Sequence, residues 1–333
     1  MAGIIAPQYQ DEGKARKHLE AIRWPDGPVC PHCGVIDEAY KLNGETTRDG
    51  LYKCAACRKP FTVTVGTIFE DSKIPLHKWL LAIHLMCSSK KGISAHQLWR
   101  NLWGTDPQTG RQLGSYRTAW FMAHRIRWAL GQEPLASKLA GIVEVDEAYI
   151  GGKKRGDSTK YSWTPSGRPK PKPVKSHTND KAPIVSILQR DGQVRSRHFD
   201  RVTLDNLKPM IEEVIDKSAH VMTDSASLLD AAPMGHKHSK VNHSKKEYVR
   251  HEDGVCITTN TVESYFAIIK RGIDGIYHHV GKAYLDQYLR EFDYRYNVRD
   301  MNDTDRFKLA VKKTEGKRLT LRNPKDTGTN DVS

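Results

Sequence analysis

Three acidic side chains lie where converging carboxylates can do chemistry. Asp146 follows β-branched, strand-like residues, and Asp224 closes another such run. Glu263 lies near the start of a helical pattern that reaches Lys270 two turns later. Converging carboxylates repel one another unless a cation neutralises them, and Mg²⁺ prefers such oxygen ligands. The pattern predicts a divalent-metal site, because two cations roughly 4 Å apart can promote phosphodiester chemistry.

Each acid taken alone also fits a turn, a helix cap or a solvated helix face, so the prediction depends on all three. Two other polar side chains share the helix of Glu263. Lys270 is seven residues further on, on the same face, where it can neutralise a phosphate or hold a flanking base. Asn260 is three residues earlier and offers an amide oxygen. Both Glu263 and Asn260 are candidates for the third metal ligand, and the charge of Glu263 favours it.

The elements that must position these acids follow a strand-rich order. We expect a helix between the last two of four strands, and a later helix that carries Glu263. The expected strands cover residues 142–150, 184–189, 194–199 and 220–223, and the helix covers 204–217. This order is that of an RNase-H-like α/β fold, a mixed sheet with flanking helices. The run 153–183, rich in Lys, Pro, Gly and Ser, is expected to be an inserted loop.

Four cysteines form two closely spaced pairs in the N-terminal part of the chain. Cys30 and Cys33 make the first pair, and Cys54 and Cys57 make the second, with twenty residues between the pairs. Two such knuckles can present four thiolates to one Zn²⁺. A closed four-thiolate site leaves no position for substrate, so we expect a structural zinc ribbon.

Three amphipathic helices are predicted after the ribbon. Pro75 opens the first, Ser94 can cap the second, and Ser115 can cap the third. Such an arrangement, with basic residues on the last helix, suits a helix-turn-helix that reads a DNA major groove. The candidate DNA-binding residues are Arg117, Arg125 and Arg127. The connection at residues 104–114 is longer than the usual turn of about 3 to 4 residues.

The charge balance favours a polyanionic partner. The chain has 53 Lys and Arg against 39 Asp and Glu, a formal net charge of +14, and a pI near 9.4. The longest apolar stretch, from Trp79 to Cys87, is too short for a membrane span. We expect no membrane association and a cytoplasmic location, where six cysteines serve as metal ligands or free thiols.

The changes in composition predict four regions. Residues 1–72 hold the zinc ribbon with an N-terminal helix, and residues 73–138 hold the helix-turn-helix-like DNA-binding segment. Residues 139–300 hold the RNase-H-like catalytic domain, and residues 301–333 form a basic C-terminal tail.

Several motifs together resemble bacterial insertion-sequence transposases that join a zinc ribbon, a helix-turn-helix and an RNase-H-like DDE domain. The matching stretches are Arg23-Trp24-Pro25-Asp26-Gly27, Gly66-Thr67-Ile68-Phe69, Val145-Asp146-Glu147 with Tyr149-Ile150-Gly151-Gly152, and Asn260-Thr261-Val262-Glu263 with Lys270-Arg271-Gly272. The resemblance implies DNA cleavage and strand transfer that depend on Mg²⁺ or Mn²⁺. It implies Asp146, Asp224 and Glu263 as metal ligands, with Lys270 as the accompanying lysine.

The resemblance also implies the partners. These are the terminal inverted repeats of the element and the target DNA, bound by a homo-oligomer. Two other functions fit parts of the pattern. One is a DNA-binding regulator with an inactive nuclease-like domain, and the other is a nuclease that cuts without joining.

Overall fold

The computed structural model describes residues 3–131, 137–151, 161–163, 169–171, 181–225 and 235–317. The chain divides into two units. The first combines Met1–Gln132 with Arg290–Ser333, and the second is Glu133–Leu289. Among the described residues, no helix has the length and apolar character needed to cross a membrane.

The first unit begins with a helix and a small sheet. The 3-10 turn η1 (Pro7–Tyr9) precedes helix α1 (Glu12–Arg23), whose N-terminus is capped by Asp11. Strands β1 (Ala39–Lys41), β2 (Tyr52–Cys54) and β3 (Pro60–Phe61) pair antiparallel in that order. The rings of Trp24, Tyr52 and Phe61 pack together beside the sheet. This cluster supplies an apolar support that so short a sheet could not provide by itself.

Helices make up the rest of the first unit. They are α2 (Leu76–Ser88), α3 (Ala95–Trp103), α4 (Tyr116–Ala129), the C-terminal part of α8 (Leu285–Asn297) and α9 (Asp303–Lys312). Their apolar side chains share one core with α1 and the ribbon. The predicted Ser94 cap is present, because its hydroxyl accepts the N–H of Gln97. Ser115 precedes α4, but its side chain accepts no capping hydrogen bond, which corrects that prediction.

The region expected to be a basic tail therefore contains α9, whose Phe307, Ala310 and Val311 are buried in the core of this unit. Residues 318–333 lie outside the described part of the chain. The boundaries predicted for the four regions, after residues 72, 138 and 300, stay predictions.

The connection between α3 and α4 folds into a hairpin-like loop. Thr105 bridges Gln112, and the Asp106 carboxylate accepts the N–H groups of Gln108 and Thr109 at 2.9 and 2.8 Å. The indole of Trp99 on α3 donates to the Leu113 carbonyl at 2.7 Å, which ties the end of the loop back to the helix. These local hydrogen bonds stabilise the connection at residues 104–114, which is longer than the turn of a typical helix-turn-helix.

The second unit is built on a five-stranded mixed sheet. Its strand order is β10 (Lys237–Val241), β9 (His220–Asp224), β4 (Ile142–Ile150), β7 (Ala182–Gln189) and β8 (Val194–His198). Strands β9 and β10 run parallel to β4, whereas β7 is antiparallel to its neighbours β4 and β8. The four expected strands are confirmed. β10 was not expected, because its sequence is polar.

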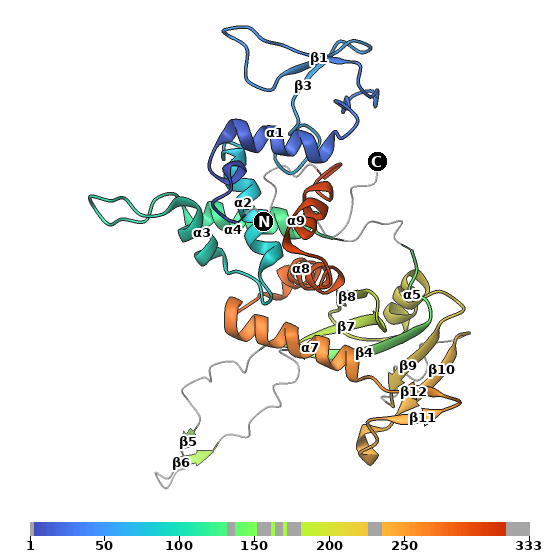
Figure 1. Ribbon diagram of the computed structural model, residues 1–333. Coiled ribbons are helices and arrows are strands. Elements are labelled where there is room, and N and C mark those ends of the chain that lie inside the picture. The colour runs from blue at the N-terminus through green and yellow to red at the C-terminus, as the bar shows by residue number, and fades with distance from the viewer. Residues whose placement is uncertain are drawn as a thin grey trace. The chain divides into compact units, whose positions relative to one another are not determined.

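Helices cover the two faces of this sheet. Helix α5 (Leu204–Val214), which begins with a capping box at Thr203, packs its apolar side on β4, β7 and β9. Helix α7 (Asn260–Gly272) contacts β4 and β7, and Figure 1 shows it running beside β4. The other elements are β5 (Tyr161–Trp163), β6 (Pro169–Pro171), η3 (His243–Lys245), β11 (Arg250–Glu252), β12 (Val255–Ile257), the π-helical turn η4 (Ile273–Tyr277) and η5 (Lys282–Tyr284). Apart from β5, β6 and residues 181–183, the inserted loop predicted at 153–183 lies outside the described residues.

Candidate active site and zinc centre

Two of the predicted acids lie on neighbouring strands. Val143 and Val145 of β4 point into the core under α5, so the alternation of the strand turns Asp146 to the opposite face. Val145 pairs in parallel register with Thr223 of β9, and Asp146 and Asp224 directly follow this last pair on their strands. Because neighbouring strands lie about 4.8 Å apart, this register places the two carboxylates side by side at the end of β9.

The third acid comes from the helix over this face. Glu263 lies in the first turn of α7 and is exposed. Its carboxylate is close enough to act electrostatically on Asp146, as is that of Asp224. Asp224 from β9 and Glu263 from α7 thus both lie within electrostatic range of Asp146 on β4.

The surroundings of Asp146 disfavour its charged form. Burial, followed by the charges of Glu263 and Asp224, raises the pKa of the Asp146 carboxyl to about 7, although the Glu147 N–H donates to it at 2.8 Å and opposes the shift. A carboxyl that is desolvated and flanked by acids gains most from a nearby cation. The donor set, carboxylate oxygens only, fits Mg²⁺ or Mn²⁺.

A histidine that the sequence did not single out contacts the third acid. His243 Nε2 lies 3.2 Å from Glu263 Oε1 and 3.2 Å from Thr259 Oγ1. Thr259 itself donates a long hydrogen bond of 3.4 Å to Glu263. No spacing rule distinguished His243, because its proximity to Glu263 arises from the tertiary fold.

The other two predicted site residues also lie on α7. Asn260 is the first residue of the helix and Lys270 is in its last turn, and both side chains are exposed. They are available to a ligand.

A second acid of β4 was missed by the sequence reasoning. Glu144 is fully buried on the face shared with Asp146, where it contacts Arg190 and the first turn of α7. The sequence signal for Glu144 was a charged residue inside an apolar strand. Burial of such a residue requires a specific partner.

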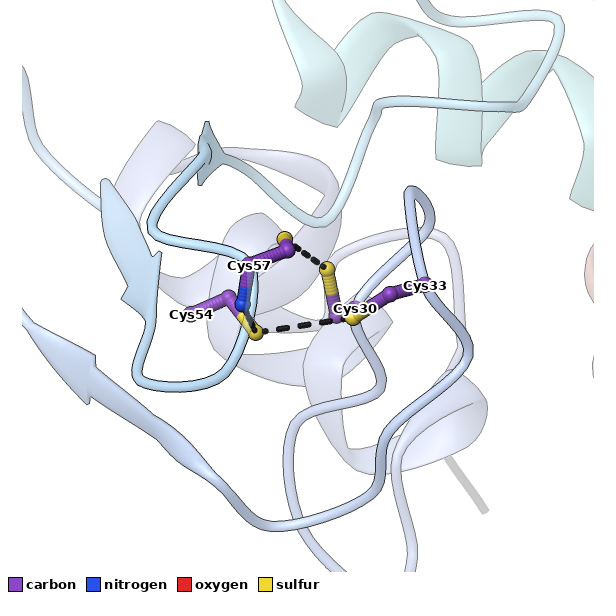
Figure 2. Close-up of side chains that lie close together, drawn as sticks. All are labelled: Cys30, Cys33, Cys54 and Cys57. Carbon is purple, nitrogen blue, oxygen red and sulfur yellow. Dashed lines mark hydrogen bonds between the residues drawn. The ribbon is translucent and has the colours of Figure 1, made fainter.

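The four predicted zinc ligands converge in the first unit. The sulfur atoms of Cys30, Cys33, Cys54 and Cys57 all lie within 4.8 Å of one another, and Figure 2 shows the two knuckles facing each other. The Cys30–Cys57 and Cys33–Cys54 sulfur distances are both 3.6 Å. Tetrahedral Zn²⁺ with Zn–S bonds of about 2.3 Å separates its sulfurs by about 3.8 Å, so the cluster fits this metal.

A backbone group favours the thiolate form of Cys54 within this cluster. The Cys57 N–H donates to Cys54 Sγ at 3.4 Å, and this bond is the main cause that lowers the pKa of the Cys54 thiol to about 7. A thiol with a lowered pKa deprotonates readily, which is the form that binds zinc. The ribbon therefore holds a structural zinc site.

The three candidate DNA-binding arginines differ in position. Arg117, near the start of α4, is exposed and lies over the Phe121 ring. Arg125 is half-buried, with Nη1 at 3.5 Å from the Ile68 carbonyl. Arg127 has 0% exposure, and its Nε donates to Glu291 Oε2 at 2.7 Å. The expectation therefore needs correcting at Arg127, since DNA cannot reach a side chain inside the core.

Comparison with known proteins covers both the zinc centre and the candidate active site. Residues 10–60 match a transposase zinc-ribbon domain, and residues 138–297 match the ISXO2-like transposase domain. The chain belongs to the insertion-sequence transposases. Its second unit is accordingly a DDE domain with the RNase-H-like fold, which confirms the predicted fold class.

A relative of this transposase is similar to it over most of the chain. An uncharacterized protein in transposable element ISH50 of Halobacterium salinarum is 26% identical over 305 residues, which cover 87% of this chain and 92% of the relative. The similarity extends beyond either matched domain alone.

Proposed function

We propose that this transposase binds the terminal inverted repeats of its own element and catalyses metal-dependent cleavage and strand transfer of DNA. The observation that supports the proposal is that Asp224 of β9 and Glu263 of α7 both act electrostatically on the carboxyl of Asp146 of β4. Carboxylates beside DNA phosphates weaken binding by repulsion, so such a cluster is useful mainly to a protein that also brings cations there.

The proposed roles follow from the positions of the side chains. Asp146, Asp224 and Glu263 hold Mg²⁺ or Mn²⁺, which when bound offsets their charge and stabilises negative charge at the reacting phosphate. The exposed Lys270 neutralises a neighbouring phosphate. In the first step water attacks the phosphodiester at the element end, and the 3′-oxygen of the element leaves as a free hydroxyl. In the second step this hydroxyl attacks a phosphodiester of the target strand, forms the new phosphodiester bond and displaces the 3′-oxygen of the target.

Recognition of the element ends is assigned to the first unit. Arg117 is exposed near the N-terminus of α4, where recognition helices present side chains to base edges. The formal net charge of +14 favours DNA as the partner. Joining two ends to one target implies that several copies of the chain act together.

The test is a cleavage and joining assay with labelled element-end DNA, a target plasmid and Mg²⁺. Asp146→Ala, Asp224→Ala and Glu263→Ala should each abolish cleavage while DNA binding persists. Asp205→Ala removes an exposed acid on α5 and serves as the matched control with normal activity. If Glu263→Ala cuts normally and Asn260→Ala is inactive, Asn260 is the third ligand.

The two other functions give different results in the same assay. Cut ends without joined products would indicate a nuclease. Specific binding with no cleavage by the wild-type protein in either Mg²⁺ or Mn²⁺ would indicate a regulator, and would overturn the proposal.

A further inference from the structure

Glu144 is an unusual residue for the middle of a sheet. It lies two residues before Asp146 on the central strand β4, and its side chain is fully buried. A charged group removed from water carries a large desolvation cost unless hydrogen bonds and an opposite charge compensate it. The neighbouring positions of β4 are valines, so an apolar residue would satisfy the sheet alone.

The carboxylate of Glu144 is engaged by the start of helix α7. Oε2 accepts the backbone N–H groups of Thr261 and Val262, each at 2.9 Å. Oε1 accepts the Thr261 hydroxyl, also at 2.9 Å. These backbone groups belong to the first turn, where the N–H groups have no partner within the helix. Thr259, the N-cap residue, makes no side-chain capping bond, so Glu144 caps the helix from another element.

Arg190 fixes Glu144 in this position. Its Nη2 and Nε donate to Glu144 Oε1 at 2.8 and 3.1 Å. Its Nη1 donates to the Cys256 carbonyl at 2.9 Å, and Nη2 lies 3.4 Å from the Thr258 carbonyl. One guanidinium thus joins the end of β7, the centre of β4 and the segment that leads into α7.

These contacts connect two of the acids through rigid elements. Asp146 is two residues after Glu144 on the same strand, and Glu263 directly follows Val262 on the capped turn. We propose that Glu144, held by Arg190, is a positioning residue that sets the location of Glu263 relative to Asp146. The inference rests on the proposed function, because it assumes that these acids hold the catalytic cations. Such sites tolerate displacements of only about 0.5 Å.

The experiment compares Glu144→Gln with Glu213→Gln in the full chain. The first substitution keeps the size of the side chain but removes its charge, and the NH₂ group of the new amide cannot accept the N–H groups of α7. Glu213 is the matched control, because it pairs with Arg197 at 3.1 Å on the surface. Two readouts are recorded: Mn²⁺ affinity by calorimetry, and the Mg²⁺ concentration that gives half-maximal cleavage.

We expect Glu144→Gln to weaken Mn²⁺ binding, and to raise the Mg²⁺ midpoint, by about 10- to 100-fold, with DNA affinity unchanged. Glu213→Gln should match the wild type. A folded Glu144→Gln protein with wild-type metal affinity and midpoint would show a merely structural role and overturn the inference. If this variant fails to fold, Thr261→Val removes one contact only. It should raise the midpoint by a smaller factor, and a wild-type midpoint there would likewise overturn the inference.

The variant Asp146→Ala distinguishes a failure of the positioning role of Glu144 from a failure of the proposed function. If it is inactive while Glu144→Gln behaves as wild type, only the positioning role fails. If Asp146→Ala itself cleaves DNA normally, the proposed function fails.

Discussion

Arg127 of α4 donates to Glu291 of α8 through a buried ion pair, with the Nε to Oε2 distance at 2.7 Å. Arg295 also donates to Glu291, so one carboxylate holds two guanidinium groups inside the first unit. Arg127→Ala removes a fully buried side chain and its bond to Glu291, which keeps its ion pair with Arg295. The lost ion pair and the cavity should destabilise the protein by about 2–5 kcal/mol, measured by urea unfolding. Arg117→Ala, exposed on the same helix, should change stability by about 0.5 kcal/mol or less, and equal losses for the two variants would contradict this.

A second prediction concerns pH. The pKa of Asp146 rises on folding from its ordinary 3.8 to about 7. A raised carboxyl pKa favours the folded state at low pH, and this contribution is lost as the pH rises through 7. Without metal, the wild type should lose more thermal stability between about pH 5 and pH 8 than Asp146→Asn does. Mg²⁺ should raise the melting temperature of the wild type more at the higher pH than at the lower. An equal rise in the melting temperature at both pH values would contradict the assignment of Asp146 as a metal ligand with a raised pKa.

The zinc centre gives a third prediction. Cys54→Ser removes a buried thiolate ligand, so the zinc content should fall from about one equivalent to near zero, and the ribbon should unfold because binding and folding are coupled there. Cys256→Ser is the control and should retain zinc, because Cys256 is not part of the cluster. Elemental analysis of freshly purified proteins decides the matter. Full zinc in the Cys54 variant would show that the four thiols do not hold the metal.

Lys270 is expected to act on DNA phosphate. Lys270→Ala should weaken binding of element-end DNA and reduce the slope of log affinity against log salt by about 1. The adjacent Arg271, also exposed but about 100° away around α7, is the control. Fluorescence anisotropy across a salt series measures both. The same slope change in both variants would indicate general charge attraction and no specific role for Lys270.

Sequence specificity is the fifth prediction. Arg117→Ala should weaken binding to element ends by about 1–3 kcal/mol while sparing random DNA. Competition binding with the two DNA types measures the difference. Equal losses on both would show that α4 does not recognise base edges.

The features predicted from the sequence are those with local signals. The β-branched residues around Asp146 predicted β4, and the paired cysteines predicted the zinc site. What could not be predicted depends on pairs that are distant along the chain. In the sequence Arg127 fits the pattern of a basic helix face. Its buried position depends on packing against residues distant along the chain, such as Glu291, which is 164 residues away. Glu144 and Thr261 are 117 residues apart, so the cap of α7 left no motif.

The first unit is assembled from the two ends of the described chain. Phe307 of α9 packs edge-on against Tyr9, with ring centroids 5.8 Å apart, and stacks beside His18. The ribosome adds about 5–20 residues per second, so roughly 15–60 s pass between the synthesis of Tyr9 and that of Phe307. The second unit, Glu133–Leu289, is continuous in sequence and can fold earlier. The first unit, whose synthesis begins before that of the second, therefore completes its folding last. Its apolar helices need protection from aggregation in the interval.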